Sequence, residues 1–321
     1  MASIATGAAP RLLDPMKFRD PDVTAKGEPR ARVGLTRLHT LWFNTGTLCN
    51  ITCANCYIES SPTNGRLVYL KAAEVASYLD ELAADPWAVE EIGFTGGEPF
   101  MNPDIIAMLG NCLGRGYRVL VLTNAMRPMM RRSEQLRELG ARYGDRLVLR
   151  VSIDHYTAAL HDRERGPGSW EKAVAGLEWL LDNGFHAHVA GRTFSGEAEA
   201  VLRAGYARLF ASRGFPIDAY DPQALVLFPE MDPLVDVPEI SESCWGILGV
   251  APEAVMCATS RMVAKRKGAE RPVVLACTLL PYDPQFEIGA TLADATGEVR
   301  LNHPHCARFC VLGGGSCSPG D

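Results

Sequence analysis

The sequence predicts an α/β protein: a partial (β/α)6 barrel of the TIM type, followed by a loop-rich extension organised by metal. Two observations predict it. Apolar strand segments alternate with amphipathic helical segments between residues 40 and 228, and most of the ten cysteines fall into two clusters at the ends of that stretch. Repeated β/α units with apolar strands are typical of a parallel sheet covered by helices. The 321 residues, 47% of them hydrophobic and 22% charged, suit a globular protein with a sizeable core.

Each expected strand is a short apolar run, and each expected helix repeats apolar residues every three or four positions. The strands are expected at 40–45, 91–95, 117–122, 147–153, 185–190 and 224–228. The helices are expected at 71–84, 103–114, 133–143, 169–183 and 196–213. Pro103 and Asp104 suit the first turn of the second helix, and Ser169 is expected to cap the fourth.

Composition divides the chain into three regions. Residues 1–37 contain several prolines and are expected to form an irregular leader. Residues 38–235 carry the repeated strands and helices and are expected to form the barrel. In residues 236–321 proline and cysteine become frequent and the helical periodicity fades, which predicts a separate, loop-rich region organised by metal.

Charge and hydropathy exclude several classes of protein. The formal net charge is −6 and the densest basic run, at 265–267, is short, so we expect no nucleic-acid partner and no anionic membrane surface. No apolar run approaches the roughly 18 residues that a membrane span needs. The N-terminus lacks the charged and apolar regions of a secretory signal. These features together favour a cytoplasmic location.

Polar and metal-binding residues follow the first four strands at their carboxyl ends. The segment 49–56, with three cysteines, follows the first strand, and Gly96-Gly97-Glu98 follows the second. Thr123-Asn124 ends the third strand, and Ser152 and Asp154 lie at the end of the fourth. Ligands of parallel α/β proteins bind at this edge of the sheet. We therefore expect these residues to meet at one mouth of the barrel.

The three cysteines have the spacing Cys49-x3-Cys53-x2-Cys56, which suits a loop around a small inorganic cluster. A [4Fe–4S] cube has four irons, and protein thiolates usually hold all of them. Three thiolates would leave one iron open to a substrate or cofactor. The alternative is a zinc site completed by a remote fourth ligand, in a zinc-stabilised binding or scaffold protein without catalytic activity.

This triplet, followed by Tyr57, resembles the signature of the radical S-adenosylmethionine (radical SAM) enzymes, and the resemblance extends over roughly residues 40–235. In that family the open iron chelates SAM, and an electron from the cluster cleaves the sulfonium to methionine and a 5′-deoxyadenosyl radical. The resemblance implies such a cluster on Cys49, Cys53 and Cys56, and an electron donor such as flavodoxin or ferredoxin. One departure is Asn55, at a position that is often aromatic in the family.

The resemblance also implies roles for the residues at the other strand ends. Backbone groups of Gly96 and Gly97 would meet the methionyl ammonium, because glycine lets a backbone approach a ligand closely, and Glu98 would hold that segment. Ser152 and Asp154 would face the ribose, and Arg165 would pair with the methionyl carboxylate. The implied SAM-binding set is Tyr57, Gly96, Gly97, Glu98, Thr123, Asn124, Ser152, Asp154 and Arg165, with Arg192 and Thr193 as further candidates.

The cysteines near the C-terminus resemble the SPASM and twitch extensions of the same family, which hold auxiliary clusters. A seven-cysteine SPASM set is absent, so one auxiliary [4Fe–4S] cluster is expected. Its four ligands are left open among Cys257, Cys277, Cys306, Cys310 and Cys317, with Cys244, His303 and His305 as further candidates and a structural zinc as the alternative. Cys112 lies in an apolar helical segment and is expected in the core.

Together these resemblances imply an oxidoreductase or maturase that removes hydrogen from a substrate and passes an electron to the auxiliary cluster. The substrate is a small molecule or a peptide. The leader of 37 residues is shorter than the roughly 80-residue leader-binding domain that peptide maturases of this family commonly carry, and this favours a small molecule slightly. No residue of the chain is assigned a direct role in the hydrogen transfer.

Overall fold

The computed structural model describes residues 11–84 and 87–314. Its strands are β1 Arg32–Val33, β2 Thr40–Asn44, β3 Glu91–Thr95, β4 Arg118–Thr123, β5 Leu147–Ser152, β6 His186–Arg192, β7 Leu225–Phe228, β8 Ser260–Ala264, β9 Val273–Leu275, β10 Glu287–Gly289 and β11 Val299–Arg300. Its α-helices are α1 Ala72–Ala84, α2 Ile105–Gly114, α3 Arg127–Met130, α4 Ser133–Tyr143, α5 Ala158–Arg165, α6 Ser169–Asp182, α7 Glu199–Arg213 and α8 Cys244–Leu248. A π-helix spans Cys306–Val311.

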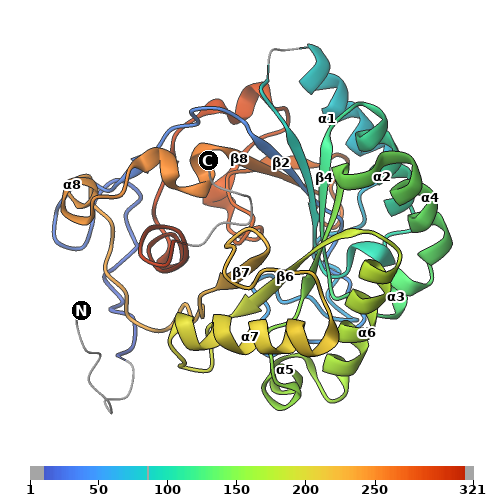
Figure 1. Ribbon diagram of the computed structural model, residues 1–321. Coiled ribbons are helices and arrows are strands. Elements are labelled where there is room, and N and C mark those ends of the chain that lie inside the picture. The colour runs from blue at the N-terminus through green and yellow to red at the C-terminus, as the bar shows by residue number, and fades with distance from the viewer. Residues whose placement is uncertain (1–10, 85–86, 315–321) are drawn as a thin grey trace.

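The central sheet has nine strands in the order β10-β9-β8-β2-β3-β4-β5-β6-β7. Strands β2 to β7 pair successively in parallel, as the six expected β/α units require. The sheet curves, and α1, α2, α4, α6 and α7 lie along its outer side (Figure 1). Because β10 and β7 are the two ends of the sheet and do not pair, the barrel is open. The expectation of a partial TIM-type barrel is confirmed.

The alternation of side chains along each strand divides the interior into two cores. On β2, Leu41 and Phe43 belong to the core between sheet and helices, together with residues of α1 and α2. Trp42 points to the other face, where it belongs to a second core with Met262 and Phe309 of the C-terminal region. The C-terminal region therefore fills the concave side of the sheet, beside the strand ends expected to carry the site.

The C-terminal region is not separate from the barrel, contrary to expectation. Strand β8 pairs with β2 in parallel, and β9 and β10 extend the sheet in antiparallel fashion. The leader packs on the same region: β1 pairs with β11, and buried Arg30 forms an ion pair of 2.6 Å with Glu239. The pairing of β8 with β2 and of β1 with β11 buries apolar residues of the C-terminal region and of the leader. The composition of these segments does not reveal such long-range pairing. Within the described residues no helix is long and apolar enough to cross a membrane.

The helix starts differ from expectation in one informative place. Ser169 lies inside the first turn of α6 and Gly168 occupies the cap position. The capping acceptor is Asp162 of α5, whose carboxylate accepts hydrogen bonds from the backbone of Gly168 and Trp170 and from the Ser169 hydroxyl. The backbone N–H groups at the start of a helix have no partner within the helix, and a capping side chain usually accepts their hydrogen bonds. Here the Asp162 carboxylate, from the preceding helix, takes that role.

Candidate functional site

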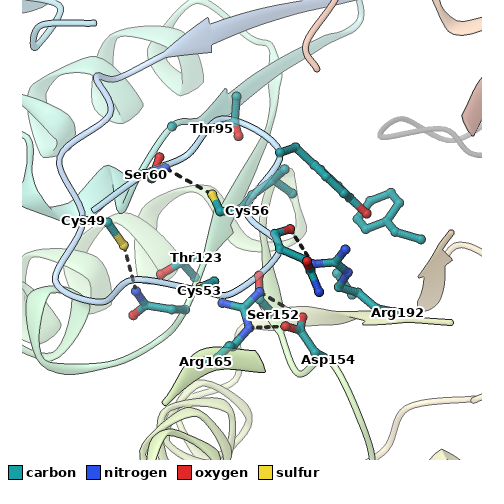
Figure 2. A pocket seen from close by; sticks show the side chains of 18 residues that line it. Cys49, Cys53, Cys56, Ser60, Thr95, Thr123, Ser152, Asp154, Arg165 and Arg192 are labelled. Carbon is teal, nitrogen blue, oxygen red and sulfur yellow. Dashed lines mark hydrogen bonds and ion pairs between the residues drawn. The ribbon is translucent and has the colours of Figure 1, made fainter. Parts of the chain in front are cut away.

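A pocket of about 840 Å³ of empty space, open at its mouth, lies at the carboxyl ends of the parallel strands. Figure 2 shows the side chains around it. Of the predicted residues on the barrel, those that line the pocket are Cys49, Cys53, Cys56, Tyr57, Gly96, Gly97, Thr123, Asn124, Ser152, Asp154, Arg165 and Arg192. Thr193 is not among the lining residues. Glu98 lies beneath the lining and is 1% exposed.

The thiols of the cysteine loop lie among hydrogen-bond donors. The Asn124 amide nitrogen is 3.9 Å from Cys49 Sγ, and the backbone N–H of Ser60 donates to Cys56 Sγ at 3.3 Å. Burial raises the pKa of Cys49 to about 12 and also raises that of Cys53, an effect that nearby Arg165 opposes. Thiols of this kind stay protonated until a metal centre supplies positive charge. The loop thus fits a metal cluster better than a free reactive thiolate.

A single zinc ion and a [4Fe–4S] cube differ in how closely they bring the sulfurs of their cysteine ligands together. Among the described residues, no three His, Cys, Asp or Glu side chains converge to hold one metal ion. A tetrahedral zinc needs its sulfur ligands at about 2.3 Å from a single point. In a [4Fe–4S] cube each thiolate binds a different iron, so its sulfurs remain further apart.

A residue that the sequence did not single out, Glu164, fixes the loop. Its backbone carbonyl accepts from Ala54 N–H at 2.7 Å, and its buried carboxylate accepts from the Asn55 amide at 2.8 Å. The Asn55 carbonyl in turn accepts from Arg192 at 2.7 Å. Asn55, the departure from the family pattern, thus ties the loop to α5 and β6. The signal available was the position of Glu164 next to Arg165.

Gly96 and Gly97 pass so close to the backbone that leads into the cysteine loop that neither position has room for a side chain. The Gly97 N–H donates to Gly46 O at 2.8 Å, and a Cβ at Gly97 would lie 2.2 Å from Leu48 O. Gly96 has a φ of +140°, and a Cβ there would lie 2.5 Å from Gly46 O. These are backbone atoms and cannot rotate away, so glycine is needed wherever two loops pass this closely.

Replacing Gly97 with alanine is expected to destabilise the protein by about 1–3 kcal/mol, because the new methyl group displaces the cysteine loop. Urea unfolding of the metal-free protein measures this directly, and the iron content after reconstitution is expected to fall as well. Gly65→Ala is the matched control, because a Cβ at Gly65 meets no atom within 4 Å. Equal stability of the two variants would contradict the close approach of the loops.

Glu98 joins the glycine segment to the end of β4. Its carboxylate accepts from Phe100 N–H at 3.2 Å, from the Thr123 hydroxyl at 2.8 Å and from Asn124 N–H at 2.9 Å. Glu98 and Thr123 therefore hold the site together from below, in keeping with the expected holding role of Glu98. Burial raises the pKa of Glu98 to about 7.

The raised pKa of Glu98 predicts a pH dependence of stability. Because its folded pKa of about 7 exceeds the ordinary value of 4.5, the stabilisation is complete below pH 4.5 and is lost as the pH rises towards and through 7. The full change amounts to about 3 kcal/mol. We expect the unfolding free energy of the metal-free protein to fall by this amount relative to Glu98→Gln, which does not ionise. Parallel pH profiles of the two proteins would contradict the raised pKa.

Asp154 and Arg165 meet each other in the pocket. Arg165 donates from Nε and Nη2 to the two carboxylate oxygens of Asp154, at 2.8 and 2.9 Å, and both side chains are largely buried. The resemblance implied separate contacts for them, with the ribose and with the methionyl carboxylate. In this structure both carboxylate oxygens of Asp154 are engaged by Arg165, and Ser152 is the neighbouring hydroxyl that lines the pocket.

Arg192 and Tyr57 form the side of the pocket nearest the C-terminal region. The Arg192 guanidinium lies 4.9 Å from the centre of the Tyr57 ring, and its buried Nε has no hydrogen-bond partner among the described residues. Tyr57 donates its hydroxyl to Pro229 O at 3.1 Å. The Tyr57 ring lines the pocket beside Phe228.

A second, small cavity lies in the C-terminal region. Four cysteines line it together with His305 and apolar side chains: Cys257, Cys277, Cys306 and Cys310. The π-helix supplies two of the four. A 3-10 turn before β8 supplies Cys257, and the segment that follows β9 supplies Cys277. Cys317 lies outside the described residues. Cys244 lies elsewhere, with its sulfur accepting from Ser241 N–H at 3.4 Å.

Aromatic rings separate the two cysteine sites. Phe309 lies on the π-helix between Cys306 and Cys310, and its ring centre is 6.1 Å from that of Tyr57 and 5.6 Å from that of Phe228. Tyr57 directly follows Cys56. The two sites therefore lie on either side of one aromatic cluster. Cys112 is fully buried in α2, and the expectation that it belongs to the core is confirmed.

Fold and site together define a class: open parallel α/β barrels that hold a three-cysteine loop beside a glycine-lined cofactor pocket at the strand ends. Residues 43–197 match the family model of the Radical SAM superfamily. The chain therefore contains a radical SAM domain, and domains of this family use a [4Fe–4S] cluster and SAM. This assignment confirms the resemblance seen in the three-cysteine motif.

Several known proteins are similar to this chain. The subtilosin biosynthesis protein AlbA of Bacillus subtilis is 32% identical over 147 residues, which are 46% of this chain and 31% of AlbA. The mycofactocin maturase MftC of Mycolicibacterium smegmatis is 28% identical over 43% of this chain and 33% of MftC. The matched segment thus spans about a third of the length of these curated relatives.

Solved structures show the same fold at low sequence identity. SuiB of Streptococcus suis, bound to its precursor peptide SuiA, has a TM-score of 0.58 and 11% identity over 80% of this chain and 63% of SuiB. The protein anSMEcpe with bound AdoMet has a TM-score of 0.57 and 13% identity over 80% of this chain and 77% of that protein. The fold likeness extends beyond the family match into the C-terminal part of the chain.

Proposed function

We propose that this protein is a radical SAM enzyme that removes a hydrogen atom from a small-molecule or peptide substrate and oxidises it with the help of a second cluster. The observation that carries the proposal is the meeting of Cys49, Cys53 and Cys56 with the glycine segment and Arg165 around one pocket. These residues come from separate segments of the chain: the loop after β2, the loop after β3 and the helix α5.

The chain's own residues bind and position the cofactors. Cys49, Cys53 and Cys56 hold the first [4Fe–4S] cluster, and Glu164 and Arg192 fix the loop that carries them. A [4Fe–4S] cluster held by these cysteines would supply the electron for reductive cleavage of SAM, the reaction that would make hydrogen removal from the substrate possible. The glycine segment and Arg165 bind the methionyl end of SAM, and Ser152 binds its ribose. Asp154 orients Arg165 through their bidentate ion pair.

The second cavity holds an auxiliary [4Fe–4S] cluster on Cys257, Cys277, Cys306 and Cys310. Four thiolates around an apolar cavity are the complete ligand set of such a cluster. When bound, it supplies an acceptor for the electron that the substrate radical loses. The aromatic cluster of Tyr57, Phe228 and Phe309 lies between the two sites.

Relatives support both substrate classes. SuiB is known in complex with a precursor peptide, and MftC is a maturase, whereas another relative is a GTP 3′,8-cyclase. The electron comes from a donor protein such as flavodoxin or ferredoxin. The requirement that these chemistries share is the cofactor pocket, which this chain carries within its radical SAM domain.

Anaerobic reconstitution followed by reduction with SAM tests the function. We expect a brown protein that binds about eight irons and eight sulfides, for two clusters, and that releases 5′-deoxyadenosine when dithionite and SAM are added. A colourless protein that binds zinc and does not cleave SAM would contradict the proposal and favour a zinc-stabilised scaffold.

A further inference from the structure

A basic pocket lies on the outer side of the cysteine loop. Four cations line it. Arg127 is the first residue of α3, Arg131 and Arg132 lie between α3 and α4, and Lys172 is in α6. The loop contributes Asn50 and Ile51 to the same pocket. In Figure 1, α3, α4 and α6 lie on one side of the barrel, away from the C-terminal region. The pocket is therefore distinct from the mouth that receives SAM and from the auxiliary site.

The charge of this pocket is not neutralised by any acidic side chain in residues 11–84 and 87–314. Arg127, Arg131 and Lys172 are exposed, and none of the four cations forms an ion pair with any described residue. No carboxylate lines the pocket. The chain as a whole has 32 basic and 38 acidic residues, so this concentration of positive charge is a local exception. Such a surface attracts a partner with an acidic face.

The pocket also has an apolar floor. Ile51, Met101 and Met126 line it together with Phe100 and Pro128. An apolar centre ringed by charges is typical of protein interfaces, in which the centre contributes affinity and the charged rim guides association. Free anions such as phosphate do not require such a floor.

A short series of side-chain contacts links this pocket to the cysteine loop. Met126 lines the pocket, and its Sδ is 3.8 Å from the Asn50 amide nitrogen. The Asn124 amide donates a hydrogen bond to the Asn50 side chain at 2.9 Å, and its nitrogen lies 3.9 Å from Cys49 Sγ. A redox group docked in the pocket would therefore approach Cys49 through a short, hydrogen-bonded path.

We propose that this basic pocket is the docking surface for the acidic electron-donor protein that reduces the first cluster. The proposal rests on the proposed function, because it places the donor next to the cysteine loop. The donor passes one electron to the cluster and is itself oxidised by one electron. Docking on this face leaves the pocket mouth free, so SAM and substrate can be bound while the electron arrives.

Binding of a flavodoxin of net negative charge to the full-length reconstituted protein tests the proposal. We expect the double variant Arg127→Glu and Arg131→Glu to weaken binding about tenfold or more at low salt. Binding of the unmodified protein is expected to weaken as ionic strength rises. Lys26→Glu with Arg271→Glu is the matched control, because it reverses two exposed charges elsewhere.

Activity provides a second, separate comparison. Flavodoxin-driven formation of 5′-deoxyadenosine is expected to fall in the Arg127/Arg131 variant, whereas dithionite, a small reductant, needs no docking surface. Absence of flavodoxin binding, or equal loss of binding in the control variant, would overturn the docking proposal. So would sedimentation showing that this face joins two copies of the chain. Failure of dithionite to drive SAM cleavage would instead contradict the proposed function. The binding comparison between the two double variants would then still decide whether flavodoxin docks on this face.

Discussion

Replacing Cys53 with alanine is expected to lower SAM cleavage by about a thousandfold or more while the second cluster remains. Cys53 lies in the pocket with Arg165 and Arg192 nearby, at the centre of the three-cysteine loop. With only two thiolates the loop cannot hold a cube whose irons normally each take a protein ligand. The measurements are 5′-deoxyadenosine formation with dithionite and the iron content, which should fall from about eight to about four per chain.

Cys112→Ala is the control for this experiment, because Cys112 is buried in α2 away from both cysteine sites. It is expected to lower stability somewhat, through loss of buried volume, and to leave iron content and SAM cleavage unchanged. If Cys53→Ala retained all the iron and cleaved SAM, the assignment of the loop as the cluster site would be wrong.

Replacing Cys310 with alanine is expected to remove the auxiliary cluster and to separate SAM cleavage from substrate oxidation. Cys310 lines the second cavity and is only partly buried, so its loss should disturb packing less than loss of the buried Cys306. We expect about four irons per chain, continued cleavage of SAM with dithionite, and loss of the oxidised product once a substrate is available.

The control for this second experiment is Cys244→Ala, which lies outside the cavity and should retain both clusters. Unchanged iron content in Cys310→Ala would show that another residue completes the ligand set, with His305 the first to examine because it lines the same cavity. Loss of SAM cleavage along with the auxiliary iron would contradict the separate roles of the two sites.

Much of the fold could be predicted because its signals are local. The apolar runs that become β2 to β7 and the periodicity of α1, α4 and α6 depend on neighbours within a few residues. The short helix α5 was missed as an element: it is polar, and its only buried side chains, His161 and Glu164, give no apolar stripe. The joining of β8 to β2 was missed because strand pairing across long stretches of chain leaves no local trace.

The candidate site shows the same division. The spacing of Cys49, Cys53 and Cys56 is a property of one loop, so the sequence of that loop was enough to indicate the family. The contact between Asp154 and Arg165 depends on where α5 packs, so sequence alone assigned each a separate ligand. Likewise, the bond from Asn55 to Glu164 explains a departure from the family pattern for which the sequence offers no reason.

By itself, then, the sequence determined the parallel barrel, the three-cysteine loop and the strand ends at which a cofactor would bind. Only the tertiary structure brought Cys257, Cys277, Cys306 and Cys310 together around one cavity, and placed the cations of α3 and α6 side by side next to the cysteine loop. The physical reason is range. Side-chain periodicity and motif spacing act over a few residues, whereas a ligand set or a charged surface assembled from distant segments exists only after the chain has packed.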